Sequence, residues 1–67
     1  MELTGKEKSM IELILKGYTN SQIAEEFQMS PDSAKVAITR IYKKFNLQNQ
    51  KNARVRLVVE YYRNSNK

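Results

Sequence analysis

Residues 30–45 constrain the fold more than any other part of the chain, and they read S-P-D-S-A-K-V-A-I-T-R-I-Y-K-K-F. Ser30 can cap a helix, and Pro31 suits the first helical position. Apolar residues then recur at three- and four-residue steps, which predicts one buried helix face: Ala34, Ala37, Ile38, Ile41, Tyr42 and Phe45. The opposite face carries Lys35, Val36, Thr39, Arg40 and Lys43, with Lys44 at its edge. Because this helix is apolar behind and basic in front, it is suited to a DNA groove.

The net charge of +5 is distributed unevenly along the chain. Residues 1–30 carry three lysines and five glutamates, a net −2, whereas residues 31–67 carry nine lysines and arginines and two acids, a net +7. A basic half is expected if it binds a polyanion, because most nucleic-acid affinity comes from neutralising phosphates. A solvated surface would produce the same asymmetry, so charge alone favours neither interpretation.

The residue types exclude several classes of protein. The chain has no cysteine and no histidine, which excludes disulfides and the usual zinc sites. It also lacks a glycine-rich phosphate loop, a nucleophile paired with a base, and an apolar run near the roughly 20 residues of a membrane span. We therefore expect no enzyme, no cofactor, no metal, no small-molecule ligand and no membrane partner.

Two capping boxes predict two helices ahead of residue 30. Thr4 with Glu7 opens a helix over about residues 5–16, which Gly17 ends in the left-handed conformation. Thr19 with Gln22 opens a short helix over about residues 20–27, and a tight turn then leads into Ser30. A short helix, a turn and a longer helix with a basic face form a helix-turn-helix, although the usual turn glycine is absent.

The C-terminal part of the chain predicts one further helix. Asn46 is expected to end the basic helix in the left-handed conformation, and Leu47 to fill the following loop. The last helix then covers about residues 50–63, and residues 64–67 are expected to be disordered. The fold class is therefore all-α: a single domain over residues 1–67, with a four-helix bundle-like helix-turn-helix fold and helices at about 5–16, 20–27, 31–45 and 50–63.

Positions on the basic helix suggest individual roles. Lys35 can donate to guanine N7 and O6, while Val36 and the Thr39 methyl can contact thymine methyls. For Val36, groove contact and ordinary exposure remain equally open. Phosphate contacts, which position the protein without reading sequence, are assigned to side chains further along this helix, at helix N-termini and before the last helix: Thr19, Asn20, Ser33, Arg40, Lys43, Gln50 and Lys51.

The last helix carries more apolar surface than one domain needs. Ala53, Leu57 and Tyr61 form a stripe that suffices to cover the core. The apolar surface continues round the helix through Val55, Val58, Val59 and Tyr62. We interpret this second stripe as a homodimer interface, because two recognition helices about 34 Å apart can bind an inverted repeat.

The motifs, in this order and spacing, resemble the LuxR/GerE-type helix-turn-helix family. They are L-T-x-x-E at residues 3–7, the helix ending at Gly17, T-N-x-x-I-A at 19–24, the M-S turn, Lys35, I-Y-x-K-F at 41–45, and L-x-N followed by Ala53. The resemblance implies a dimeric, sequence-specific transcription regulator that binds double-stranded DNA in the bacterial cytoplasm, on the nucleoid. It also implies base contacts at Lys35, Val36 and Thr39.

Some positions depart from the family pattern. The usual Arg-Glu-x-Glu is Lys6-Glu7-Lys8-Ser9, Thr-Val before the lysine is Ser33-Ala34, the common histidine is Ala37, the glycine ending the basic helix is Asn46, and an arginine is Gln50. The last change removes a cation that often touches the DNA backbone, so that contact is expected to be weaker or only polar.

Two other functions remain open. The chain could be a σ-factor region-4-like promoter-binding module, and a contact with RNA polymerase is also left open. It could instead be a dimerising protein-interaction module that antagonises a related regulator. The operator, the direction of regulation, the controlling signal, and whether the chain is a whole protein or an excised domain are not fixed by these residues.

Overall fold

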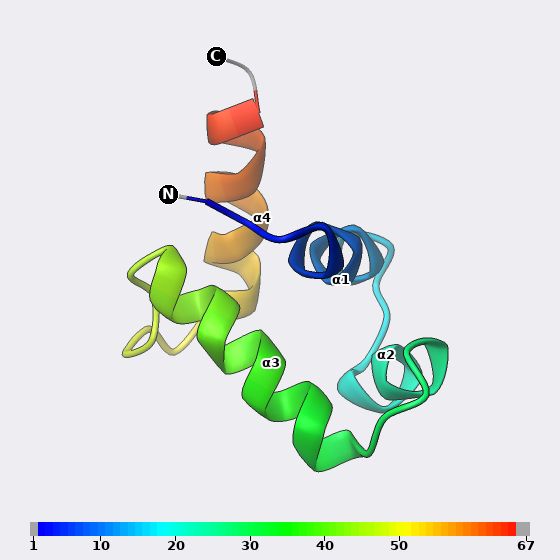
Figure 1. Ribbon diagram of the computed structural model, residues 1–67. Coiled ribbons are helices and arrows are strands. Elements are labelled where there is room, and N and C mark those ends of the chain that lie inside the picture. Colours follow the sequence, from blue (N-terminus) through cyan, green and yellow to red (C-terminus); the bar gives the residue numbers. More distant parts are fainter. Residues whose placement is uncertain (1, 66–67) are drawn as a thin grey trace.

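The computed structural model describes residues 2–65, with side chains as far as Arg63. This part of the chain contains no strand and four helices, α1 (Gly5–Leu15), α2 (Asn20–Glu26), α3 (Pro31–Lys44) and α4 (Ala53–Ser65) (Figure 1). The predicted all-α class with four helices is therefore confirmed. Met1, Asn66 and Lys67 lie outside the described residues, including the part of the predicted disordered tail that falls on the last two.

The predicted starts of the first three helices are confirmed by their hydrogen bonds. The Thr4 hydroxyl accepts from the Glu7 backbone N–H at 3.1 Å, and the Glu7 carboxylate accepts from the Thr4 N–H at 2.9 Å. Thr19 and Gln22 form the same reciprocal pair at 3.2 and 2.8 Å. At the start of α3, the Ser30 hydroxyl accepts from the Ser33 N–H, and Pro31 occupies the first turn. These bonds satisfy N–H groups that the first turn of a helix leaves without a partner.

The first three helices end in the same way. Gly17, Gln28 and Asn46 follow them with φ angles of +88°, +54° and +61°. After each, the next N–H bonds a carbonyl five residues back, as from Met29 to Ala24 at 2.9 Å and from Leu47 to Tyr42 at 2.8 Å. These are Schellman motifs, in which a left-handed residue lets the chain reverse and satisfy the last carbonyls. Gly17 and Asn46 were predicted in this role, and Gln28 was not.

The predicted bounds of the last helix were wrong at both ends. α4 begins at Ala53 rather than near residue 50, because residues 48–52 form turns in which the Gln50 N–H bonds the Leu47 carbonyl at 3.0 Å. Leu47 is buried in the core, and the turns that follow it separate this buried position from the start of α4. At the other end α4 continues to Ser65, so residues 64–65, which we expected to be disordered, are helical.

One apolar core joins all four helices. Its buried side chains come from each helix and from the loop before α4: Met10, Ile11, Ile14, Ile23, Ile38, Ile41, Phe45, Leu47, Ala53 and Leu57. Ala24 and Ala34, both buried, allow α2 and α3 to pack closely at the helix-turn-helix. No polar or charged side chain is buried in the described part of the chain. The fold is therefore held mainly by hydrophobic burial, at about 1.5–3 kcal/mol for each large aliphatic side chain.

The arrangement of the helices leaves one side of α3 free. In Figure 1, α3 crosses diagonally beneath α1, α2 lies beside the N-terminal end of α3, and α4 stands behind with its second half projecting beyond the others. α3 packs against α1, α2 and α4 through its buried face. The remaining face of α3 is exposed to solvent, so its side chains are free to bind a partner.

Candidate nucleic-acid interface

The exposed face of α3 carries the side chains that the sequence placed there. Ala34, Ile38 and Ile41 are buried against the other helices. On the other side lie exposed Lys35, Val36, Thr39, Arg40 and Lys43. Val36 is 53% exposed, one of four large hydrophobic side chains that are exposed in the described part of the chain. This surface offers cationic donors together with methyl groups, the two kinds of contact that base edges in a major groove accept.

Lys44, at the end of α3, does not belong to this surface. Its ammonium group donates to the Glu7 carboxylate at 2.7 Å and to the Glu2 carbonyl at 3.1 Å. The hydrogen bond from Lys44 is the main reason why the pKa of Glu7 lies below its usual value, with the Thr4 N–H adding to the effect. Lys44 therefore connects the C-terminal end of α3 to the start of α1.

The residues at the start of α2 are engaged with one another and with α4. Thr19 is occupied by its capping box. The Asn20 side-chain oxygen accepts from the Arg54 guanidinium at 3.0 Å, and this guanidinium also donates to the Tyr18 carbonyl. The amide nitrogen of Asn20 has no partner among the described residues, so its two donors remain available to an acceptor. Arg54 was not predicted to have a role, because only the fold brings α4 beside the α1–α2 loop.

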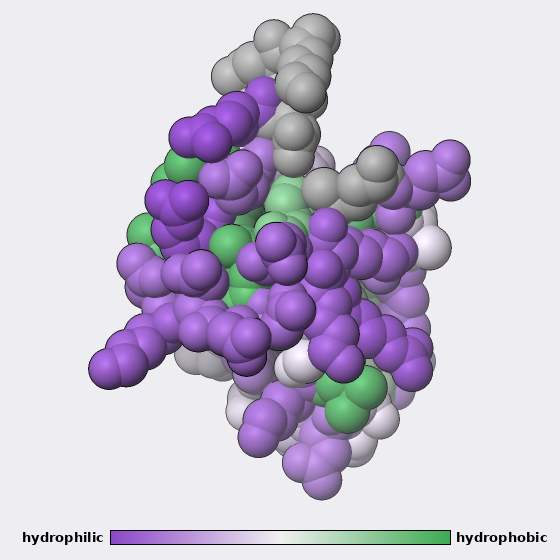
Figure 2. Space-filling model, turned by 90° about the vertical axis from the view of Figure 1, so that its left-hand side faces the viewer, coloured by the Kyte–Doolittle hydropathy of each residue, from purple (hydrophilic) through white to green (hydrophobic). Residues whose placement is uncertain are grey.

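The other residues predicted to contact the DNA backbone are exposed. The Ser30 and Ser33 hydroxyls are hydrogen-bonded at 3.0 Å, and this pair keeps one hydroxyl proton free to donate elsewhere. Gln50 and Lys51 lie in the turns before α4 and are exposed. Figure 2 views the side that carries the end of α3 and this loop, where hydrophilic side chains predominate and hydrophobic ones form small separate patches.

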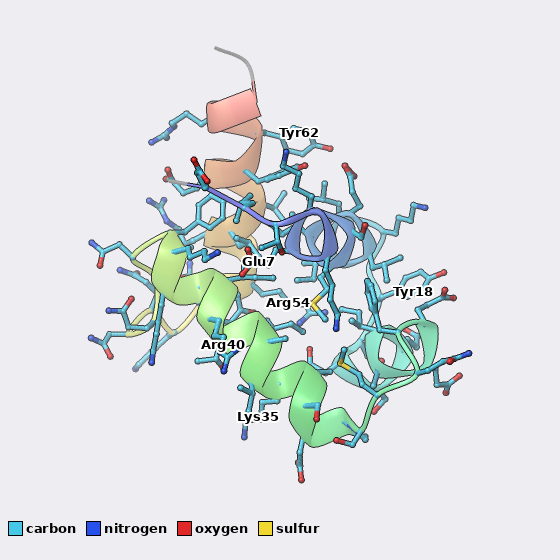
Figure 3. All side chains as sticks on the ribbon, viewed as in Figure 1. Glu7, Tyr18, Lys35, Arg40, Arg54 and Tyr62 are labelled. Carbon is cyan, nitrogen blue, oxygen red and sulfur yellow. The ribbon has the colours of Figure 1, made fainter. Side chains whose placement is uncertain are left out.

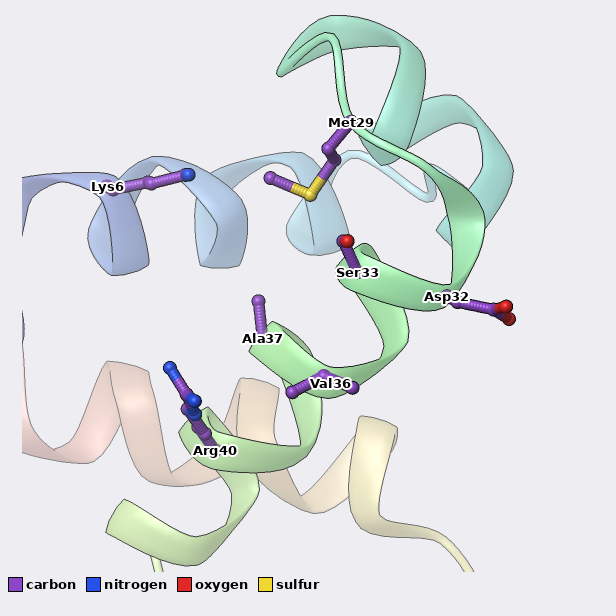
Figure 4. Close-up of a pocket in the computed structure, with 7 residues that line it drawn as sticks. All are labelled: Lys6, Met29, Asp32, Ser33, Val36, Ala37 and Arg40. Carbon is purple, nitrogen blue, oxygen red and sulfur yellow. The ribbon is translucent and has the colours of Figure 1, made fainter.

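A shallow hollow beside α3 contains a lysine that sequence reasoning did not assign. Its lining residues come from α1, the turn before α3 and the α3 flank: Lys6, Met29, Asp32, Ser33, Val36, Ala37 and Arg40 (Figure 4). Lys6 extends from α1 so that its ammonium group lies 5.8 Å from the centre of the Phe27 ring. Only the packing of α1 beside the helix-turn-helix brings this lysine to α3.

The predicted dimer surface is mostly exposed. Val55, Val59 and Tyr62 are 63%, 41% and 55% exposed. Val58, in contrast, is half-buried and packs against the core of its own chain. Tyr61 is half-buried beside Tyr62, with 6.5 Å between ring centres, and burial raises the pKa of its hydroxyl. The exposed apolar side chains of α4 are therefore two valines and one tyrosine, and Arg56 and Arg63 are exposed on the same helix. Figure 3 labels Tyr62 near the C-terminal end of α4.

Comparison with known proteins identifies the family. Residues 1–57 match the family described as "Bacterial regulatory proteins, luxR family". The chain belongs to the LuxR family. This confirms the resemblance found in the motifs, and the LuxR-type helix-turn-helix is a DNA-binding, non-enzymatic domain of transcription regulators. The match ends at Leu57, within α4.

Two curated LuxR-type relatives carry the name "HTH-type transcriptional regulator MalT". They come from Vibrio campbellii (strain ATCC BAA-1116) and Vibrio parahaemolyticus serotype O3:K6 (strain RIMD 2210633). Each is 38% identical over 51 residues, which is 76% of this chain but 6% of the relative. The chain thus corresponds to a small part of these longer regulators. No solved structure matches it significantly.

Neither a candidate metal site nor a candidate membrane span occurs among the residues that the structure describes. They contain no group of three or more acidic, histidine or cysteine residues that could hold a metal. None of their helices is long and apolar enough to span a membrane.

Proposed function

We propose that this chain binds specific sequences in double-stranded DNA by placing α3 in the major groove, and so regulates transcription. The observation that supports this most directly is the exposed face of α3, where Lys35, Val36 and Thr39 lie opposite the buried face. The N-terminal half of a recognition helix normally meets the base edges; Lys35 and Val36 lie in that half, and Thr39 lies one turn after Lys35 on the same face. Lys35 would donate to a guanine, while Val36 and Thr39 would contact thymine methyls.

The backbone contacts in this proposal surround α3. Arg40 and Lys43 lie on α3 itself, and both are exposed. The other contacts are at the helix starts and before α4: Thr19, Asn20, Ser33, Gln50 and Lys51. Of these, Asn20 retains free amide donors, and the hydrogen-bonded Ser30–Ser33 hydroxyl pair keeps one free proton, as phosphate binding requires. The Thr19 hydroxyl oxygen already accepts from the Gln22 N–H, so Thr19 would contact phosphate only by donating its hydroxyl proton while it still caps α2.

Selection of bound duplexes from a random pool tests the base contacts. Lys35→Ala should cost about 1–3 kcal/mol of discrimination at one base pair and relax the preference there alone. Lys16→Ala, at an exposed lysine after α1, is the matched control and should leave the selected sequences unchanged. An equal loss of affinity for all sequences in Lys35→Ala would mean that Lys35 touches only phosphate. Affinity that does not depend on salt would contradict the proposal as a whole.

We further propose that the chain binds DNA as a homodimer through α4, on an inverted repeat. Val55, Val59 and Tyr62 support this because they are exposed apolar side chains within two turns of one helix. Val58 would contribute only its outer edge, since it packs on its own core. A two-fold axis through α4 would pair two copies of α3, which is the symmetry that an inverted repeat requires.

Affinity for one half-site and for a palindrome tests the dimer. The unmodified chain should bind the palindrome more tightly, and Val59→Asp should remove that advantage because it places a charge in the interface. Ser9→Asp adds the same charge to an exposed position on α1 and should leave the advantage intact. Equal affinity for both duplexes, unchanged by Val59→Asp, would refute the dimer. Dimerisation without DNA binding would instead favour the alternative function, a protein-interaction module that antagonises a related regulator.

The bacterial cytoplasm, on the nucleoid, is the location that fits this proposal. Microscopy of a fluorescent fusion tests it, and the signal should coincide with a DNA stain. Lys35→Ala combined with Arg40→Ala should disperse that signal through the cell.

A further inference from the structure

We propose that Lys6, Arg40 and Ser33 form one binding site for a phosphate of the DNA backbone, so that α1 takes part in the interface. This inference rests on the proposed function and extends it to a helix outside the helix-turn-helix. The three side chains come from α1 and from one flank of α3, and all three line the same shallow hollow (Figure 4).

The hollow offers donors and positive charge. Lys6 and Arg40 both extend into it, and neither forms an ion pair within the described part of the chain, where Glu7 and Glu60 take the other bridging cations. The Ser33 hydroxyl shares one hydrogen bond with the Ser30 hydroxyl, so this pair keeps one proton that can be donated to an anion. Two cations that share one space repel each other, and an anion between them relieves this repulsion.

The remaining lining residues fit a backbone phosphate and its sugar. Met29 and Ala37 give an apolar wall, which a sugar can contact. Asp32 also lines the hollow, but its carboxylate points away from Lys6 and Arg40 (Figure 4). The hollow adjoins the exposed face of α3, since Val36 and Arg40 line it as well. A helix seated in the major groove would therefore bring one of the flanking strands past this site.

Lys6 contacts α2 in the free protein. Its ammonium group lies 5.8 Å from the centre of the Phe27 ring, within the range of a cation–π contact. Phe27 caps the end of α2 and is half-buried, so the ring itself is fixed by the fold. The contact lies near the outer limit of the cation–π range, and Phe27 does not itself line the hollow, so the contact favours one orientation of the Lys6 side chain without fixing it.

Affinity for a short duplex of mixed sequence, measured over a range of salt concentrations, tests the site. Lys6→Gln should weaken binding about three- to tenfold at low salt and make the slope of log K against log salt shallower by about 0.9. Lys6→Arg should restore both values, because it keeps the charge. Lys8→Gln removes an exposed charge from the same helix and should change both much less. The double variant Lys6→Gln with Arg40→Gln should lose less than the product of the single losses, because both residues hold one phosphate.

The outcomes separate this site from the proposed function. If Lys35→Ala relaxes sequence preference while Lys6→Gln changes neither affinity nor salt slope, the site is refuted and the groove contact stands. If the chain does not bind DNA, the phosphate site and the proposed function are both refuted. A loss in Lys6→Gln that Lys6→Arg does not restore would mean that Lys6 acts only by packing on Phe27, and would also overturn the site. Circular dichroism at the binding temperature confirms that each variant is folded.

Discussion

Gln28 has a backbone conformation that its side chain does not favour, and replacing it should stabilise the protein. Its φ angle is +54°, in the left-handed region, and it follows α2 at the position that Gly17 takes after α1. A residue with a Cβ pays about 1–2 kcal/mol for this conformation, whereas glycine adopts it freely. Glycine also loses about 0.5–1 kcal/mol through its greater freedom in the unfolded chain. Gln28→Gly should therefore raise the free energy of unfolding by about 0.5–1 kcal/mol.

Thermal and urea unfolding, followed by circular dichroism, measure this change. For a chain of this size, 1 kcal/mol corresponds to a shift of about 4–8 °C in the unfolding temperature. Gly17→Ala is the mirror experiment: a Cβ at Gly17 would meet no atom within 4 Å, so the variant reports backbone strain alone and should lose a similar amount. Glu25→Gly, at an exposed position inside α2, is the control. It should destabilise the protein, because glycine is unfavourable within a helix. A neutral or destabilised Gln28→Gly, beside a destabilised Gly17→Ala, would refute the reasoning.

Two further predictions concern side-chain hydrogen bonds and ion pairs that connect different parts of the fold. Because the pKa of Glu7 is lowered in the folded state, its pairing with Lys44 stabilises the protein above the ordinary glutamate pKa of 4.5 and is lost as the pH falls through the lower folded value. Glu7→Gln, which can still accept from Thr4, should thus be less stable than the unmodified chain at neutral pH, and an unfolding series that shows the same difference in acid would contradict this. Arg54→Met removes the donor that joins α4 to Tyr18 and Asn20 and should cost about 1–2 kcal/mol in urea unfolding. Arg56→Met, which breaks only an exposed pair with Glu60, should cost about 0–1 kcal/mol, and equal losses in the two variants would count against a special role for Arg54.

The helix starts and the buried face of α3 could be predicted because their signals are local. Thr4 and Glu7 lie three residues apart and find each other within one turn of helix, whatever the rest of the chain does. The same holds for Ser30 and Pro31. Asn46 could be predicted as a left-handed residue because asparagine tolerates that conformation. Glutamine does not favour it, so the left-handed conformation of Gln28 could not be predicted from its residue type.

Most of the missed features depend on contacts between distant residues. The start of α4 was missed because Asn49 and Asn52 are both residues that can cap a helix, and the sequence alone does not choose between them. Arg54 interrupts an apolar stripe in the sequence, and its partners become visible only when α4 lies beside Tyr18. Lys6 likewise meets the α3 flank only through the packing of α1. The residues proposed to contact bases could be named from the sequence, but the surroundings that position them could not.

The absence of buried polar side chains from the described part of the chain has a consequence for how this fold can vary. An interior without hydrogen bonds imposes no partner on any residue, so aliphatic side chains can be exchanged together as long as the total volume is kept. The four helices share such an interior, with Ile11, Ile23, Ile41 and Leu57 at its centre. Designed libraries of core variants should therefore yield many folded members, and they offer a route to a more stable scaffold on which the α3 surface can be altered one residue at a time.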